Sequence, residues 1–204
     1  MKILRWSFSG WILVPTLLLA GPPQIENAHF EGLSLQGDLE GVVATWSESS
    51  SEPTWLGWHV PMADGDQVLC CGSGADWRRR GRVCELEGTH RHFVFSSRRD
   101  FTSLPPGENL VVLLRAGGGH LDDLQIFSEG CPLDANGRKM IWLEGVDPDD
   151  SVALMGELVG GTQPANRTGR LADEALMALA LHAAPAAAES LISAAESNPS
   201  SEIR

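Results

Sequence analysis

Four cysteines carry the clearest chemistry in this sequence: Cys70, Cys71, Cys84 and Cys131. An even number of cysteines in a chain that begins with an export signal favours two disulfides over free thiols. A bond between the adjacent Cys70 and Cys71 is strained by backbone geometry. We therefore expect one of them to bond to Cys84 and the other to Cys131, and the sequence leaves the choice between these two connectivities open.

A metal site is the alternative use of these residues. Cys84 is followed by His90 and His92, and zinc prefers cysteine and histidine ligands. Neither cysteine group has the two-residue gap of a CxxC motif, and a His-x-His pair on a strand commonly just places two residues on one face. The leading interpretation therefore contains no metal site and no cofactor.

Sequence motifs for catalysis are incomplete. No GxSxG nucleophile motif occurs, and Gly72-Ser73-Gly74 lacks the third glycine and the helix of a dinucleotide site. The segment Asp134–Gly137 resembles the start of a calcium loop, but Lys139 and Gly145 stand where that loop needs glycine and glutamate. These patterns predict a protein that is not an enzyme.

The remaining charged and aromatic groups are best explained by structure. Acidic residues after Val146 fit a helix start better than a cation site, and adjacent acids on one strand point to opposite faces. An arginine run fits a solvated loop, and tryptophans in a β domain more often fill the core than line a sugar site. The groups are Asp147, Asp149 and Asp150; Asp122 and Asp123; Arg78, Arg79 and Arg80; and Trp46, Trp55, Trp58 and Trp142.

Length and charge limit the classes of function. The 204 residues fit one domain, or one domain with a small appendage. The formal net charge of −12 argues against binding to nucleic acid or to anionic membrane surfaces, because both are bound mainly through clustered Lys and Arg.

The first 20 residues resemble a secretory signal, with Lys2 and Arg5 ahead of the apolar stretch Trp11–Ala20. That stretch is shorter than the roughly 20 residues of a membrane helix. We expect cleavage after Ala20 and export to the periplasm or the extracellular space, with no membrane span in the mature chain. Leu18 stands where a small residue is preferred, so an uncleaved anchor is the alternative.

Residues 21–146 alternate between short β-rich runs and turn residues, which predicts an antiparallel β domain. Gly117–Gly119 and Asn136-Gly137 are the two strongest hairpin turns, because both can supply positive φ angles. The polar segment Ser47–Pro53 is expected to be a flexible surface loop. The expected strands are Gly41–Trp46, Thr54–Pro61, Gln67–Cys71, Arg82–Glu87, His92–Ser96, Asn109–Arg115, Leu121–Phe127 and Arg138–Leu143.

The remainder of the chain predicts helices, so the expected fold class is α+β. Residues 147–160 form a helix that packs on the β domain, and residues 161–170 form a linker. Residues 171–204 form two amphipathic helices, the first with acids in its first turn and the second beginning at Pro185. Their apolar faces have helical spacing and comprise Ala172, Leu176, Leu179 and Ala183, then Ala188, Leu191, Ile192 and Ala195.

These helices resemble HEAT repeats, antiparallel helix pairs that stack into an ARM-like α-solenoid. The segments Asp173–His182, Pro185–Glu196 and Pro199–Arg204 carry the resemblance, the last as a new repeat beginning, so the array is expected to be cut short. The layout also resembles exported bacterial HEAT-repeat proteins with a cysteine-containing N-terminal region, through Trp55–Pro61, Cys70-Cys71, Cys84 and Cys131–Gly137.

The resemblance implies a noncatalytic protein-interaction module that contacts an unidentified protein partner. The repeat face would comprise Leu176, Leu179, Leu191 and Ile192. The alternative function is an extracytoplasmic metal-binding protein or enzyme centred on Cys84, His90 and His92.

Overall fold

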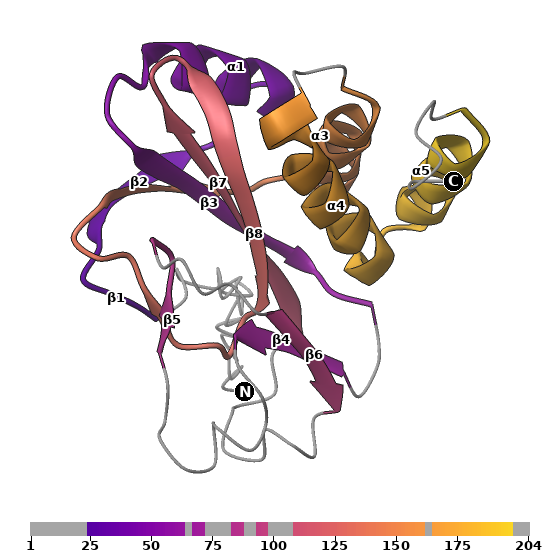
Figure 1. Ribbon diagram of the computed structural model, residues 1–204, viewed down its shortest axis with the longest axis horizontal. Coiled ribbons are helices and arrows are strands. Elements are labelled where there is room, and N and C mark those ends of the chain that lie inside the picture. Colours follow the sequence, from indigo (N-terminus) through magenta and orange to yellow (C-terminus); the bar gives the residue numbers. More distant parts are fainter. Residues whose placement is uncertain are drawn as a thin grey trace, which may run out of the picture.

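The computed structural model describes residues 24–63, 67–71, 83–87, 93–97, 108–161 and 165–197. A five-stranded sheet with the order β2-β10-β3-β7-β8 forms the centre, and helices cover one of its faces (Figure 1). Its strands are β2 (His29–Ser34), β3 (Thr54–Pro61), β7 (Asn109–Gly117), β8 (His120–Ser128) and β10 (Lys139–Glu144). The helices are α1 (Leu39–Ser49), α3 (Pro148–Gly160), α4 (Ala165–Leu181) and α5 (Pro185–Ser197).

Two smaller sheets complete the described structure. One has the order β1-β9-β5, from β1 (Ile25–Glu26), β9 (Leu133–Asp134) and β5 (Cys84–Glu85), and the other pairs β4 (Gln67–Cys71) with β6 (Phe93–Ser97). Buried side chains from β1, β4, β5 and β9 pack with the face of the large sheet that carries Trp55 and Trp142. The molecule is therefore α+β, with a core on each side of the large sheet.

The large sheet is mixed, which corrects the expectation of an antiparallel domain. β10 pairs in parallel with both β2 and β3, whereas β3, β7 and β8 are antiparallel. Parallel pairing arises because α1 carries the chain from β2 to β3, so that β2 and β3 run in the same direction on either side of β10. The strand pattern alone contains no information on this crossover.

The segment Gly41–Trp46 is helical, so its assignment to a strand was wrong. The carboxylate of Asp38 accepts a hydrogen bond from the Gly41 N–H and caps α1. The apolar positions also repeat with helical spacing, which outweighs the local β propensity of the Val-Val pair. Residues 47–49, expected in a loop, form the last turn of α1. The buried side chains of α1 are Leu39, Val43, Trp46 and Ser47.

Both expected glycine turns are present, but only one of them is a hairpin turn. Gly118 and Gly119 have φ angles of 65° and 80° and join β7 to β8 as a hairpin. Asn136 and Gly137 also have positive φ angles, 52° and 77°. They join β9 to β10, which belong to different sheets, so this turn is not a hairpin turn.

Helix α3 begins at a capping residue and is hydrogen-bonded to the sheet. Its N-cap residue Asp147 accepts a hydrogen bond of 2.8 Å from the Asp149 N–H, as a helix start requires. The indole Nε1 of the buried Trp58 on β3 donates to Oγ of Ser151 at 3.1 Å. Polar and apolar contacts together therefore hold α3 on this face of the sheet.

The HEAT-repeat prediction was wrong, because α4 packs on the sheet and α5 packs on α3 and α4 instead of forming a helical solenoid. α4 contacts β7, β8 and α3, and α5 contacts α3 and α4. Backbone hydrogen bonds from Ala63 N–H to the Leu181 carbonyl (2.8 Å) and from Ala183 N–H to the Pro61 carbonyl (3.0 Å) fix the α4–α5 turn against the end of β3. A solenoid repeat buries its apolar face on the next repeat, whereas α4 buries it on this domain.

Helix bounds and faces also differ from the expectation. α4 begins at Ala165, inside the expected linker, so Asp173 and Glu174 lie in the helix interior and not in its first turn. Of the expected repeat face, Leu179 is buried, Leu176 and Leu191 are half-buried, and Ile192 is 59% exposed. None of the described helices is long and apolar enough to cross a membrane.

Candidate binding surface

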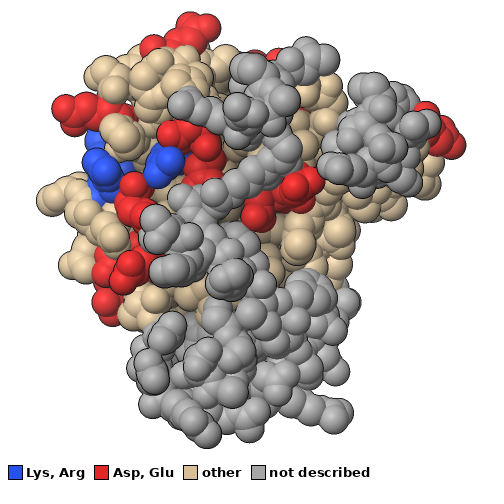
Figure 2. All heavy atoms as spheres, in the orientation of Figure 1, with Lys and Arg blue, Asp and Glu red and all other residues tan. Residues whose placement is uncertain are grey.

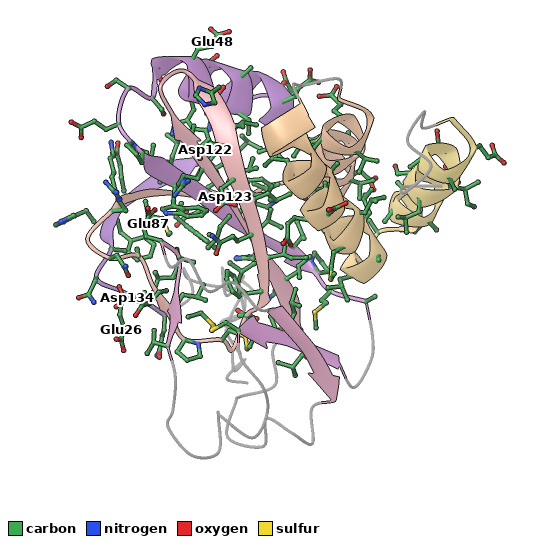
Figure 3. The ribbon with its side chains drawn as sticks, viewed as in Figure 1. Glu26, Glu48, Glu87, Asp122, Asp123 and Asp134 are labelled. Carbon is green, nitrogen blue, oxygen red and sulfur yellow. A yellow bond between two sulfur atoms is a disulfide. The ribbon has the colours of Figure 1, made fainter. Side chains whose placement is uncertain are left out.

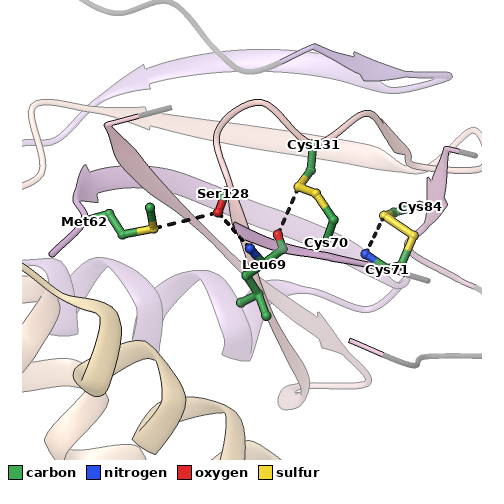
Figure 4. The surroundings of a disulfide bond; sticks show 7 residues. All are labelled: Met62, Leu69, Cys70, Cys71, Cys84, Ser128 and Cys131. Carbon is green, nitrogen blue, oxygen red and sulfur yellow. Dashed lines mark hydrogen bonds between the residues drawn. A yellow bond between two sulfur atoms is a disulfide. The ribbon is translucent and has the colours of Figure 1, made fainter. Parts of the chain in front are cut away.

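The two disulfides join Cys70 to Cys131 and Cys71 to Cys84, with Cα–Cα distances of 5.8 and 5.6 Å (Figure 4). Successive side chains of a strand point to opposite faces, so adjacent cysteines on β4 reach different partners. The prediction of two bonds is confirmed, and the tertiary structure selects the connectivity. Disulfides of this kind indicate an oxidising, extracytoplasmic environment.

Hydrogen bonds around the disulfides attach β4 to the end of β8. Oγ of Ser128 accepts from the Leu69 N–H at 3.0 Å, and its hydroxyl lies 3.8 Å from the sulfur of Met62. The Cys71 N–H points to Sγ of Cys84 at 3.1 Å (Figure 4). The cysteines therefore serve as a structural clamp between β4, β5 and the segment after β8.

The alternative zinc site loses its central ligand in this arrangement. Sγ of Cys84 is bonded to Sγ of Cys71, so it is not available as a thiolate while the disulfide is intact. His90 and His92 lie outside the described residues, as do Arg78, Arg79 and Arg80. Among the residues that are described, no group of three His, Cys, Asp or Glu side chains is arranged to hold a metal ion.

A polar network on the face opposite the helices was missed by sequence reasoning (Figure 3). Arg115 on β7 donates to Asp122 through Nε (2.8 Å) and Nη2 (3.2 Å), and to Glu87 through Nη1 (3.1 Å). Glu87 also accepts from Nε1 of Trp55 at 3.0 Å and lies 3.6 Å from Nη2 of Arg138. The network attaches the turn after β5 to the large sheet.

The electrostatics of this network keep Arg115 charged. Burial lowers the pKa of Arg115, but the hydrogen bond and charge of Asp122, with the charges of Glu87 and Asp123, outweigh burial and raise the pKa above its ordinary value. Its guanidinium carbon lies 5.7 Å from the ring centroid of Trp55. All three guanidinium nitrogens have protein partners, so this arrangement suits a structural clamp.

The tryptophans lie inside the protein, as expected. Their exposed fractions are 9% or less, which removes them as a sugar-binding platform. Asp122 and Asp123 have separate roles: the former binds Arg115, and Oδ2 of the latter accepts from Nε2 of Gln125 at 2.8 Å. The tryptophans concerned are Trp46, Trp55, Trp58 and Trp142.

The outer edge of β2 is an accessible surface of the described structure with unpaired backbone groups. All six residues of β2 are exposed, including Phe30 at 41% and Leu33 at 47%. Among the described strands, β2 pairs only with β10 and forms one edge of the sheet. The opposite edge differs, because the β8 residues Asp123–Ser128 are buried.

The direction of the backbone groups of β2 follows from its parallel pairing with β10. The N–H groups of His29 and Leu35 donate to the carbonyls of Arg138 and Glu144, both at 3.0 Å. In a parallel pair, alternate residues of a strand bond to the neighbour. The N–H and C=O groups of the intervening residues therefore point away from β10. These outward residues are Phe30, Gly32 and Ser34.

Sequence reasoning missed β2 because its six residues lack a continuous apolar alternation. Its strand conformation depends on pairing with β10, more than 100 residues later in the chain. Signals for such an edge strand are weak in a single sequence, since exposed strands carry mixed residue types.

Neither the edge nor the Arg115 network is a sequence motif specific to one family. No protein-family model, curated protein or solved structure matches this chain.

Proposed function

We propose that this chain is a noncatalytic, exported protein-binding module that binds an extended segment of another chain along the outer edge of β2. Binding of this kind, β-strand addition, uses main-chain hydrogen bonds for affinity and flanking side chains for specificity. The proposed binding does not involve HEAT repeats. The carrying observation is that β2 is exposed along its whole length, with outward backbone groups at Phe30, Gly32 and Ser34.

The flanking side chains of β2 also suit binding. Phe30 and Leu33 are large apolar residues with about half of their surface accessible, 41% and 47%. An exposed edge strand with apolar side chains is a template for pairing with another chain, and monomeric proteins usually protect such edges. Its exposure in this protein supports a role in binding.

Other features support the absence of catalysis and the export of the chain. The charged network of Arg115 with Glu87 and Asp122 is engaged in holding the turn after β5 on the large sheet. Two disulfides and the Lys2, Arg5 and Trp11–Ala20 pattern support export to the periplasm or the extracellular space.

The proposal can be tested with peptides selected from a random library on the oxidised protein. Bound peptides should slow amide hydrogen exchange at Phe30, Gly32 and Ser34, whose N–H groups point outward. Exchange at Glu31 and Leu33, already bonded to β10, should change little. Protection by the selected peptides at any other surface, with Phe30, Gly32 and Ser34 unchanged, would contradict the proposal.

A further inference from the structure

We propose that the segment bound at this edge is β2 of a second copy of the same chain, paired antiparallel about a two-fold axis at Gly32. The inference rests on the proposed function, because it names the occupant of the same edge. A two-fold axis makes the same patch serve on both copies, so β2 has to be complementary to itself. Backbone geometry, charge and side-chain size each bear on that requirement.

The backbone groups of β2 match in this register. Centring the axis on Gly32 places Gly32 opposite Gly32, and Phe30 opposite Ser34 of the second copy. These are the residues whose N–H and C=O groups point outward. In an antiparallel pair, opposite residues with facing backbone groups exchange two hydrogen bonds. Every outward backbone group of β2 then has a partner, and two five-stranded sheets become one continuous sheet.

Neighbouring registers are less favourable. An axis at Glu31 would place two carboxylates directly opposite each other, which is destabilising across a strand pair. An axis at Leu33 would place Phe30 opposite Gln36, which lies beyond the end of β2. The register centred on Gly32 opposes Glu31 to Leu33 and keeps the three outward residues, Phe30, Gly32 and Ser34, paired within the strand.

The side chains on one face also fit. Phe30, Gly32 and Ser34 share the face of Met140 and Trp142, as their pairing with β10 shows. A Cβ atom at Gly32 would have no other atom within 4 Å, so the surface above this glycine is open. In the proposed pair, Phe30 lies diagonally next to Gly32 of the second copy, and an aromatic ring covering a strand glycine is a stabilising arrangement.

Basic side chains lie beside acidic ones near this edge, although the full sequence carries a net charge of −12. Lys139 at the start of β10 bonds to Glu31 at 2.7 Å, and Arg138 lies 3.6 Å from Glu87. Figure 2 shows the blue side chains of the visible face gathered in one region at the left, next to red ones. The long-range repulsion between copies is screened by salt, so dimerisation should strengthen as ionic strength rises.

Sedimentation equilibrium of the oxidised, exported protein over a range of concentrations tests the inference. We expect a reversible dimer whose dissociation constant rises at least tenfold in Gly32→Pro. Proline removes an outward N–H and is tolerated at the edge of a sheet. Ile192→Lys on α5, an exposed position far from β2 in sequence, is the control and should dimerise normally.

A charge pair checks the register without a change in the backbone. Phe30→Lys with Ser34→Lys should abolish the dimer, because positions 30 and 34 of different copies are opposed. Phe30→Lys with Ser34→Glu should restore it, since opposite charges then face each other. Equal dimerisation of the two double variants, or an unchanged dimer in Gly32→Pro, would overturn the proposed pairing.

The oligomeric state and the peptide-protection experiment together distinguish a failure of this inference from a failure of the proposed function. A wild-type protein that stays monomeric at millimolar concentration and high salt would overturn the second copy as occupant. If selected peptides still protect Phe30, Gly32 and Ser34 in that monomer, the edge binds a different protein and the proposed function stands. If neither a second copy nor a peptide protects these amides, both are overturned.

Discussion

The indole of Trp55 and the carboxylate of Glu87 meet across the face of the large sheet that is opposite the helices, with Nε1 donating to Oε1 at 3.0 Å. Trp55 is fully buried in β3, and Glu87 follows β5 of the small sheet. The same carboxylate is 3.1 Å from Arg115 and 3.6 Å from Arg138. One side chain therefore links three parts of the fold.

Removing this carboxylate should destabilise the protein. Glu87→Ala leaves the buried Trp55 N–H and Nη1 of Arg115 without their acceptor, although Asp122 still binds Nε and Nη2 of Arg115. A buried polar group that loses its partner costs about 1–3 kcal/mol. Lys139→Ala, which breaks a pair whose side chains are 52% and 60% exposed, should cost less than about 1 kcal/mol. Urea unfolding of both variants at a concentration that keeps them monomeric makes the comparison. Equal losses would contradict the linking role of Glu87.

Two glycines of the large sheet, Gly57 on β3 and Gly32 on β2, should respond differently to alanine. A Cβ at Gly57 would lie 2.7 Å from Cδ2 of Leu113 and 2.8 Å from Cζ3 of Trp142, so Gly57→Ala forces two buried side chains to move. Overpacking of this kind costs about 1–3 kcal/mol. Gly32→Ala meets no atom within 4 Å and should change the free energy of unfolding by less than about 0.5 kcal/mol. Thermal unfolding measures the stability of both variants. An equal loss in the two would contradict the close packing around Gly57.

His182 should make the α4–α5 turn sensitive to acid. Nδ1 of His182 accepts from the Ala184 N–H at 3.1 Å, and Nε2 is buried with no hydrogen-bond partner among the described residues. Burial lowers the pKa of His182 from its ordinary value of 6.5, and the nearby charge of Asp149 opposes this only in part. A histidine with a lowered pKa is protonated more readily in the unfolded chain. Stability should therefore fall as pH drops below about 6.5.

The variant His182→Asn isolates this contribution. The asparagine Oδ1 can accept from the Ala184 N–H in place of Nδ1, but it does not titrate. The free energy of unfolding, measured from pH 7.5 to pH 5, should fall less steeply in His182→Asn than in the wild type. Parallel curves for the two proteins would assign the acid sensitivity to other groups.

The two disulfides should be reduced in a fixed order. Cys71 is half-buried, whereas Cys70, Cys84 and Cys131 are at most 2% exposed, so an attacking thiolate reaches the Cys71–Cys84 bond first. That bond spans 13 residues and the other spans 61. Chain entropy assigns them about 3 and about 4 kcal/mol, so the protein should stay folded after the first reduction.

Limited reduction followed by alkylation and mass spectrometry checks this order. The first product should carry label on Cys71 and Cys84 with the Cys70–Cys131 bond intact. A first product labelled on Cys70 and Cys131 would show that accessibility does not control the reaction.

The sequence by itself determined the elements whose signals are local. Thr54–Pro61 and Gln67–Cys71 have the expected strand bounds, and the Gly118 turn and the start of α5 at Pro185 lie where their turn and cap residues place them. The number of disulfides also followed from the even cysteine count. Such signals succeed because a residue's own conformational preference decides them.

Only the tertiary structure decided the features that join distant parts of the chain. Cys70 selects Cys131 because β4 directs it towards the end of β8, and β2 becomes a strand because β10 pairs with it. The apolar face of α4 fits a solenoid repeat as well as it fits a sheet, because a helical period specifies burial but not the surface that supplies it. In this protein that surface is α3, which directly precedes α4, together with β7 and β8, which lie far from α4 in the sequence.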